Sequence, residues 1–492
     1  MLVALKGFAP DMDPTIPGVL VDCVAKVPTL KGMKAGASLV TVGLPALAAA
    51  CLGAQTLQKL DGSYRLFAGT TVALFEANGI ASWTDRTRLA GAYNATSDIR
   101  WRFAQYGDVS LAVEKQDILQ FITTGADFAN VGAGVPKASI VETVRQFVFL
   151  FDTNEATYGD STNRWWCCAI GDYTDWTPAI GTQCVTGVLT SSPGPLRAGR
   201  RLGDAIVAYK ERSMFLGTYV GPPSAWSFQE VSNIAGAQSQ ETVVPIVTKQ
   251  GGAAHISMGA DNFYYYDGSR PIEIGNPIKE WFFARLNSDF AYRSQAINDD
   301  VNSLIYFFYP STASVTGTLD SCVVYNYKVD KWGVHNQTVE AAAISISDGL
   351  TYAQVEANYA TYSAIPNISY GSPFWFSGAR NVGIFNSSHV LQTLTGAAGE
   401  SSMTTGDIGD DENEMLVHRV RPRYLTAPTS ASLINYYRQN LGDSLTTDMT
   451  TAKAGGTFDF MRSARWHRLK ITDTGNSEVP ALDIEAVKDG LE

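Results

Sequence analysis

The chain has 492 residues and a net charge of −11, and only 17% of its residues are charged while 45% are hydrophobic. This is the composition of a globular protein, and its acidic balance argues against tight binding to nucleic-acid phosphates. Its 44 glycines, 22 tyrosines, 22 phenylalanines and 10 tryptophans favour β-structure, because aromatic side chains fill pleated surfaces and glycine permits tight turns.

The first 60 residues are rich in Pro and Gly and predict an extended arm. They open with one early lysine followed by acids and prolines, so we expect neither a signal peptide nor secretory export. The most apolar stretch, residues 37–53, is short and broken by Pro45, so no membrane-spanning segment is expected. The six cysteines show no zinc spacing and are expected to be reduced thiols buried in strands.

Residues 61–395 contain many short apolar runs punctuated by turn residues. In residues 204–232, strands are expected over 205–209 and 214–220, and a third strand carries Trp226. The same rhythm of strand and turn returns elsewhere, in residues 64–83, 101–128, 147–176 and 304–335. These units predict a series of small antiparallel meanders rather than alternating strands and helices.

Large aromatic residues recur at a nearly constant interval along this region. Trp83, Phe128, Trp176 and Trp226 are separated by 45, 48 and 50 residues, and Trp332 lies 106 residues beyond Trp226. A repeat of this length built from meandering strands is typical of a β-propeller. We therefore predict an all-β fold with a β-propeller of six blades, with seven blades as the alternative. A large β-sandwich or several small β-domains would also give short strands and turns.

Two segments of the predicted propeller differ in their expected burial. The segment NFYYYDGSRPIEIG, residues 262–275, is predicted to be an inner strand buried on both faces, with its turn at Asp267-Gly268. The segment SSPGPLRAGRR, residues 191–201, is interpreted as an exposed connection carrying an arginine pair.

The C-terminal residues 396–492 are predicted to form a small β platform together with the N-terminal arm, residues 1–60. Residues 396–417 look like a polar loop, and four strand-like segments follow it. The loop holds a group of acids that we expect to be solvated or to line a channel; a Ca²⁺ site is the alternative, although the alternate-position acids of an EF-hand loop are missing. These candidates are Asp407, Asp410, Asp411, Glu412 and Glu414.

A basic stretch follows the acidic one. Arg419, Arg421 and Arg423 alternate, so on a strand their side chains point to one face. Arg462, Arg465 and Arg468 add to the positive charge. We interpret these arginines as an interface with another subunit or partner; a phosphate-contacting face and a plainly solvated surface are the alternatives.

Nothing in the sequence assembles a nucleophile, a base and an oxyanion site. The five histidines are scattered, and no HExxH, Walker or GxSxG pattern occurs in its context. We therefore expect no enzymatic activity, no metal and no cofactor.

Several segments resemble the tail nozzle or tail hub proteins of short-tailed bacteriophages, also called DNA stabilisation proteins. The segments are DPTIPGVLVDCVAKVPTLKGMKAG, LDGSYRLFAGT, ERSMFLGTYVGPPSAWSFQEV, FYYYDGSRPIEIGN, VVYNYKVDKWGVH and RSARWHRLKIT. The resemblance covers most of the chain. It implies a propeller joined to a platform formed by the chain ends, and it brings no catalytic residues.

The resemblance also implies an assembly. Six copies would form a homohexameric ring below the head-to-tail adaptor, made in the host cytoplasm and placed in the virion. The ring would extend the tail channel, retain packaged double-stranded DNA without binding it specifically, and carry fibres or spikes. The chain is short for this family, so the loops at 350–370 and 396–414 are the expected substitutes for larger tip domains.

The acidic balance suits passage of DNA, because acidic walls repel phosphates. We therefore hypothesise that the loop at 407–414 faces the channel, and neutralising its acids is expected to slow DNA ejection. A lectin-like, carbohydrate-binding propeller is the alternative function, and a propeller hydrolase is a second rival.

Overall fold

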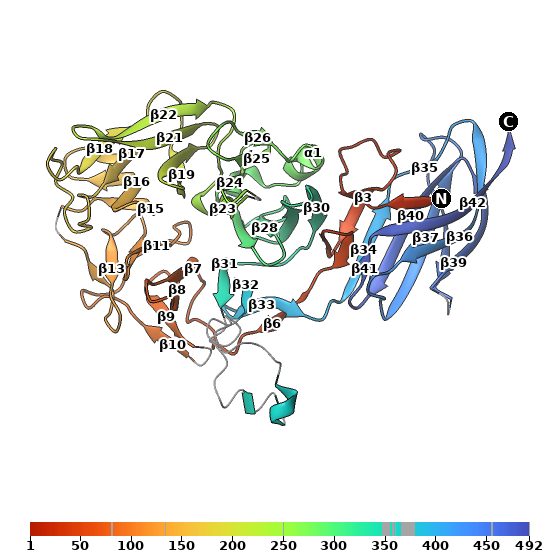
Figure 1. Ribbon diagram of the computed structural model, residues 1–492, viewed down its shortest axis with the longest axis horizontal. Coiled ribbons are helices and arrows are strands. Elements are labelled where there is room, and N and C mark those ends of the chain that lie inside the picture. The colour runs from red at the N-terminus through yellow and green to blue at the C-terminus, as the bar shows by residue number, and fades with distance from the viewer. Residues whose placement is uncertain are drawn as a thin grey trace.

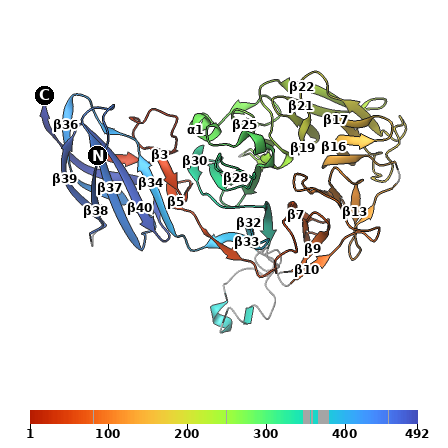
Figure 2. The same ribbon diagram turned by 180° about the vertical axis from the view of Figure 1, so that it is seen from behind.

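The computed structural model describes residues 1–79, 82–132, 134–248, 250–346, 355–356, 359, 361–365, 379–453 and 456–491. The chain is almost wholly β-structure, arranged as a β-propeller beside a second body of two packed sheets (Figure 1). Both termini lie in this second body, which we call the platform, as the view from behind also shows (Figure 2).

Within the described residues, seven sheets surround the propeller axis, so the blade number is seven rather than the favoured six. The first four blades are each a four-stranded antiparallel meander. They comprise β7 (Gly53–Gln58), β8 (Tyr64–Gly69), β9 (Leu74–Asn78) and β10 (Ser82–Asp85); β11 (Arg102–Tyr106), β12 (Val109–Val113), β13 (Gln120–Ile122) and β14 (Ala129–Asn130); β15 (Lys137–Val144), β16 (Phe147–Glu155), β17 (Gly159–Cys167) and β18 (Val185–Val188); and β19 (Leu196–Leu202), β20 (Ala205–Lys210), β21 (Met214–Gly221) and β22 (Ala225–Ser232).

The last three blades bring in segments from the chain ends. The fifth comprises β23 (Val243–Val247), β24 (Ala253–Met258), β25 (Phe263–Tyr266) and β26 (Ile272–Glu273). The sixth comprises β27 (Gln295–Asp299), β28 (Leu304–Tyr309), β29 (Ser321–Asn326) and β30 (Lys331–Val334), extended by β4 (Lys26–Pro28), β5 (Met33–Ala35) and β41 (Glu478–Val479). The seventh comprises β31 (Ala341–Ile346), β32 (Arg380–Phe385), β33 (Leu391–Gly396) and β6 (Ser38–Thr41).

The N-terminal strand β6 completes the ring. It pairs antiparallel with β33, with Val40 opposite Thr393 and Leu39 opposite Leu394. The innermost strands then pack in sequence around the axis, from β7 to β31, and β31 packs back against β7. The seventh blade takes its outer strand, β6, from the segment 1–60 that was assigned to the arm. The arm thus supplies β6 and β7 to the propeller as well as strands to the platform.

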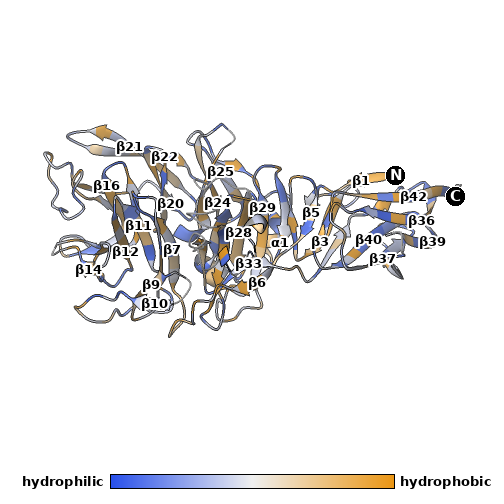
Figure 3. Cartoon of the chain, turned by 60° about the horizontal axis from the view of Figure 1, so that its bottom comes forward, coloured by the Kyte–Doolittle hydropathy of each residue, from blue (hydrophilic) through white to orange (hydrophobic). Residues whose placement is uncertain are grey.

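The platform is a sandwich of two sheets. One sheet has the order β1 (Leu2–Ala4), β42 (Ala481–Leu491), β36 (Asn413–Arg423) and β39 (Phe458–Ala464). The other contains β2 (Gly7–Phe8), β3 (Val19–Val24), β34 (Glu400–Thr405), β40 (Trp466–Thr474), β37 (Ser430–Arg438) and β38 (Thr446–Thr451), with β35 (Ile408–Gly409) beside β40. Figure 3 shows both termini at the end of the platform away from the propeller, and apolar residues distributed along the strands of both bodies.

Two expectations for the C-terminal region were wrong. The expected polar loop at 396–417 contains β34, which is hydrogen-bonded on both sides and buries Ser402 and Thr404. Its side chains are small and polar, so their burial leaves no apolar pattern in the sequence. The third of the four strand-like segments after that loop, residues 458–472, is two strands, β39 and β40, which lie in different sheets.

In the segment 262–275, β25 is buried on both faces, as predicted, but β25 is the third strand of the fifth blade rather than an inner one, and β26, which follows it, is exposed. Phe263 joins the core shared by blades five and six and the platform, whereas Tyr264 and Tyr266 join the core shared with the fourth blade. Because that first core runs without interruption from propeller to platform, the two bodies are held together by apolar packing.

Helices are few and short in the described residues. They are η1 (Gln240–Thr242), α1 (Lys279–Phe283), η2 (Ser288–Arg293) and η3 (Tyr362–Ala364). No helix in the described residues has the length and hydrophobicity needed to span a bilayer. All six cysteines are buried and unpaired, as expected.

Candidate functional site

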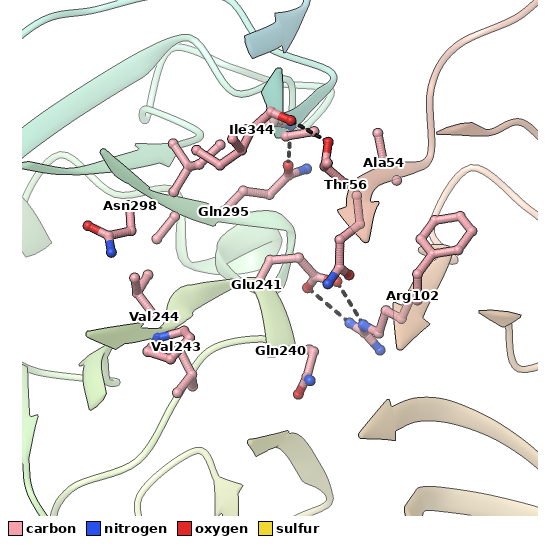
Figure 4. A pocket seen from close by; sticks show the side chains of 18 of the residues that line it. Ala54, Thr56, Arg102, Gln240, Glu241, Val243, Val244, Gln295, Asn298 and Ile344 are labelled. Atoms are coloured by element: carbon pink, nitrogen blue, oxygen red, sulfur yellow. Dashed lines mark hydrogen bonds and ion pairs between the residues drawn. The ribbon is translucent and has the colours of Figure 1, made fainter. Parts of the chain in front are cut away.

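An axial cavity of about 340 Å³ lies where the innermost strands converge (Figure 4). Strands β7, β11, β19, β23, β27 and β31 contribute to its lining. Since the propeller fold brings one strand of each blade to the axis, residues far apart in the sequence meet here. Side chains from six of the blades therefore converge on this cavity.

Arg102 and Glu241 form an ion pair across this cavity, as Figure 4 shows. The Arg102 Nε donates to Glu241 Oε1 at 2.7 Å, and its Nη2 donates to Oε2 at 3.1 Å. The remaining Nη1 donates to the carbonyl oxygen of Ser139 at 2.7 Å. Burial raises the pKa of Glu241, but the Arg102 guanidinium outweighs it, so that the net pKa lies below the ordinary value of 4.5. Glu241 is thus held as a carboxylate that braces the second blade against the turn before the fifth.

Arg200 makes a second brace from the fourth blade. Its Nη1 lies 3.6 Å from Glu142 Oε2, and its Nη2 donates to the carbonyl oxygen of Gln240 at 3.1 Å. Burial raises the pKa of Glu142, and the charge of Arg200 opposes that rise only in part. The expected exposed connection at 191–201 is therefore wrong, because β19 is an innermost strand and Arg200 lines the axial cavity.

Neutral groups brace the rest of the axial cavity. Gln295 accepts a hydrogen bond from the Ala342 backbone at 3.0 Å and donates to the carbonyl oxygen of Glu340 at 3.1 Å. Thr56 donates to the carbonyl oxygen of Ile344, joining the first blade to the seventh. These bonds tie blades to one another around the axis, which suits a rigid ring. No group of His, Cys, Asp or Glu side chains suited to a metal ion occurs in the part of the chain that the structure describes.

The predicted acidic residues lie in the platform and do not form one open cluster. Asp407 is buried between two arginines, with Oδ2 at 2.7 Å from Arg438 Nη2 and 2.8 Å from Arg468 Nη2. Asp407 therefore departs from the expected channel lining, because its charge is already compensated inside the platform. Arg468 holds Asp407, and whether Arg468 also takes part in an interface stays a prediction.

The other predicted acids lie nearer the surface. The Asp410 carboxylate accepts hydrogen bonds from the backbone and side chain of Asn413, which lower its pKa below the ordinary value of 3.8. Asp411 accepts a hydrogen bond from Trp466 Nε1 at 3.1 Å, and Glu414 accepts from Ser463 Oγ at 3.0 Å. Glu412 is exposed. Whether these four acids line a channel stays a prediction.

Three of the predicted arginines lie on β36 and share one face, as expected. Arg419, Arg421 and Arg423 are exposed, whereas Val420 and Pro422 between them are buried. Arg419 Nε donates to Asp459 Oδ1 at 2.8 Å, and Arg423 Nη2 lies 3.5 Å from Asp483 Oδ2. Among the described residues, Arg421 has neither a hydrogen bond from its side chain nor an ion pair.

The other two predicted arginines lie at or just after β39. Arg462 Nη2 lies 3.3 Å from Asp448 Oδ2, and its guanidinium stacks over the ring of Tyr437. Arg462 therefore contacts the second platform sheet, to which β37 and β38 belong. The backbone N–H of Arg465 donates to Gln439 Oε1 at 3.3 Å. Whether Arg465 takes part in an interface stays a prediction. We call the exposed outer face of the sheet that holds β36, β39 and β42, with Arg419, Arg421 and Arg423, the arginine face.

Sequence reasoning missed the axial residues Arg102, Arg200 and Glu241. A signal was present, because Arg102 and Arg200 sit in short strand-like segments next to apolar residues. A buried charge on a strand calls for a partner, but the partners lie in other blades and could not be paired from the sequence.

The strand pairing defines the class of this protein as a seven-bladed β-propeller carrying a two-sheet platform made from both chain ends. No known family model matches the sequence, and no curated protein matches it. Among solved structures, the chain is similar to BamB from Moraxella catarrhalis, with a TM-score of 0.39 and 11% identity over 80% of this chain and 99% of that one.

Two further propellers are similar at the same level. YCF48 from Cyanidioschyzon merolae gives a TM-score of 0.36 at 11% identity, covering 73% of this chain and 98% of that one. Virginiamycin B lyase from Staphylococcus aureus gives 0.38 at 9% identity, covering 63% and 92%. These likenesses concern the β-propeller fold alone.

Proposed function

We propose that this chain is a structural protein of a short phage tail, in which copies join through their platforms into a ring that extends the DNA channel. The sequence resemblance to tail nozzle proteins supports this function. The observation that carries it is the arginine face, whose charges are left incompletely paired within one chain.

The ion pairs on the arginine face leave the guanidinium of Arg421 without an acidic partner among the described residues. Arg421 lies opposite Asp483 in the register of β36 and β42. Asp483, however, is already close to Arg423 and to the amino group of Met1, at 3.5 and 3.9 Å. An exposed guanidinium on a rigid strand, with no acid left for it, is suited to a carboxylate of a neighbouring copy, and the chain's net charge of −11 makes such carboxylates plentiful.

Apolar side chains beside the arginines support the same use. Met461 on β39 is 73% exposed and Val487 on β42 is 57% exposed. Arg and Met are enriched in protein interfaces, so exposed apolar side chains beside incompletely paired arginines fit such a contact. The occupant that we propose for this face is a second copy of the chain, repeated around a ring of six.

The decisive experiment is electron microscopy of the purified protein, combined with light scattering after size exclusion. We expect closed rings with six-fold symmetry and a central passage. Substituting Arg421→Glu together with Arg423→Glu should convert rings to monomers, because like charges placed across an interface cost several kcal/mol.

Arg212→Glu is the matched control, since Arg212 is an exposed arginine of the propeller that pairs with Asp261 at 3.4 Å. This variant should keep the rings. Rings that survive both platform substitutions would contradict the assignment of the interface. A monomer at every concentration, with binding to a glycan array, would instead support the lectin-like alternative.

A further inference from the structure

A second, smaller cavity of about 170 Å³ lies beside the axial one, and we call it the side cavity. Four cationic side chains and two carboxylates line it, from the second, third and fourth blades and from η2 and the loop before β11. They are Arg100, Arg102, Lys115, Arg197, Asp98 and Asp152. An excess of positive charge inside an acidic protein needs an explanation, because buried charges are normally paired.

Both carboxylates of the side cavity are already engaged. Asp98 pairs with Arg293 and accepts a hydrogen bond from the Tyr292 hydroxyl at 3.0 Å. Asp152 pairs with Lys115 and accepts a hydrogen bond from Ser139 Oγ. Neither acid is therefore left to balance the remaining arginines.

Arg102 is also engaged, through Glu241. Arg100 and Arg197 differ from it, because neither forms an ion pair with an acid in the described residues. Arg100 donates from Nη1 to the carbonyl oxygens of Ser97 and Ile99, at 3.0 and 3.4 Å. The Nε atoms of Arg100 and Arg197 are both buried without a hydrogen-bond partner.

The electrostatic environment of Arg100 would favour a bound anion. Burial lowers the pKa of its guanidinium from the ordinary value of 12.5; the carboxylate of Glu241 opposes this shift, and the positive charges of Arg293 and Arg102 add to it. An anion in the side cavity would offset this penalty, and it would give Arg100 and Arg197 the negative partner that neither has among the described residues.

We propose that the side cavity binds a phosphate dianion held between Arg100 and Arg197. Guanidinium groups match phosphate oxygens with paired hydrogen bonds, and a volume of about 170 Å³ admits one such tetrahedral ion. The bound ion would tie the second blade to the fourth beside the axis. A nucleotide could supply the same group, with its base reaching into the axial cavity, which Arg100 and Arg102 also line.

The test measures thermal unfolding of the full-length protein against inorganic phosphate, with ionic strength held constant by sodium chloride. We expect a saturable rise in Tm, since a ligand bound only by the folded state stabilises that state. Arg197→Gln should abolish the rise and, without phosphate, should unfold no lower than the wild type, because Arg197 is half-buried and forms no ion pair in the described residues that the substitution would break. In titration calorimetry, Arg197→Gln should weaken phosphate binding on the order of ten- to a hundredfold, the loss expected for one hydrogen bond to a charged group.

Arg201→Gln is the matched control, because Arg201 is an exposed arginine on the same strand and lies outside the side cavity. It should keep the full response to phosphate. Should Arg197→Gln fail to fold, Arg197→Lys retains the charge and should bind phosphate measurably more weakly than the wild type.

Adenosine monophosphate forms the second arm of the experiment. A response to phosphate but not to the nucleotide would support a free ion, and an Arg197-dependent response to the nucleotide would support the same site with a nucleotide source. The proposal is overturned if neither ligand raises Tm, or if Arg197→Gln keeps the wild-type response.

Discussion

Lys26 and Asp473 form a buried ion pair at the junction between propeller and platform, and breaking it should cost much of the stability of that junction. Lys26 lies on β4 in the sheet of the sixth blade, and Asp473 lies on β40 in the platform. Both side chains are fully buried, with Lys26 Nζ at 2.8 Å from Asp473 Oδ2. Lys26 Nζ also donates to Ser477 Oγ at 2.9 Å, and the Tyr424 hydroxyl donates to Asp473 Oδ1 at 2.8 Å.

The magnitude follows from this geometry. Asp473→Asn leaves an ammonium group with no exposure to water and no counter-charge among its bonded neighbours. Removing one partner of such a pair typically costs about 3–5 kcal/mol of unfolding free energy. Adding Lys26→Met removes the uncompensated charge, so the double variant should recover most of that loss, since neutral replacements of a buried pair are often tolerated.

The assay is urea unfolding of the two single variants and the double variant, analysed as a double-mutant cycle, with calorimetry to detect separate melting of platform and propeller. The exposed pair Arg145–Asp204, at 3.3 Å, provides the contrast. Arg145→Gln should change stability by at most about 1 kcal/mol. The reasoning is refuted if Asp473→Asn costs no more than Arg145→Gln, or if the effects of Lys26→Met and Asp473→Asn simply add.

Two further predictions concern the propeller core. His255 is buried; its Nε2 donates to the carbonyl oxygen of Arg201, its Nδ1 accepts from the Tyr209 hydroxyl, and burial lowers its pKa from 6.5 to about 4. The unfolded chain therefore takes up this proton first as pH falls, so the histidine should remove about 3 kcal/mol of stability between pH 6.5 and pH 4. His255→Gln should flatten the measured dependence over that range, and an unchanged slope would count against the buried neutral imidazole. Trp332→Ala should lower the free energy of unfolding, measured in urea, by about 3–5 kcal/mol, because Trp332 is 1% exposed and its ring centroid lies 4.8 Å from that of Phe263. A loss under about 1 kcal/mol would contradict the place of Trp332 in the core that propeller and platform share.

The strands of individual blades could be predicted from the sequence because they are set by local patterns. The meander expected over residues 204–232 is present as β20, β21 and β22, with Trp226 in the third of these strands. The repeat could be recognised from the spacing of aromatic residues, because Trp83, Trp226 and Trp332 each lie in the fourth strand of a blade. Short-range pairing and turn residues were enough for this part of the fold.

The ring closure and the platform could not be predicted in the same way. Strand β6 joins a blade whose other strands lie more than 300 residues further along the chain, and no local pattern names its partner. The burial of strand β34 could not be recognised from the sequence, because its buried side chains are mostly serines and threonines. The alternation at Arg419, Arg421 and Arg423 was readable because it needs only the two-residue period of a strand.

Charges at the axis illustrate the same limit for sites. Arg102 and Glu241 are 139 residues apart and meet only because the second and fifth blades face the same axis. The buried partnership of Asp407 with Arg438 and Arg468 was equally out of reach, since acids clustered in sequence gave the impression of an exposed loop.

The position of β6 has a consequence for biosynthesis. The strand emerges from the ribosome among the first residues, yet β33, its partner, ends only at Gly396. Until then, the propeller of the nascent chain stays open, with unpaired strand edges on its first and last blades, and β42, which pairs with β1, arrives later still. Translation that stops early should therefore leave an incompletely folded product with exposed strand edges, which is prone to aggregation.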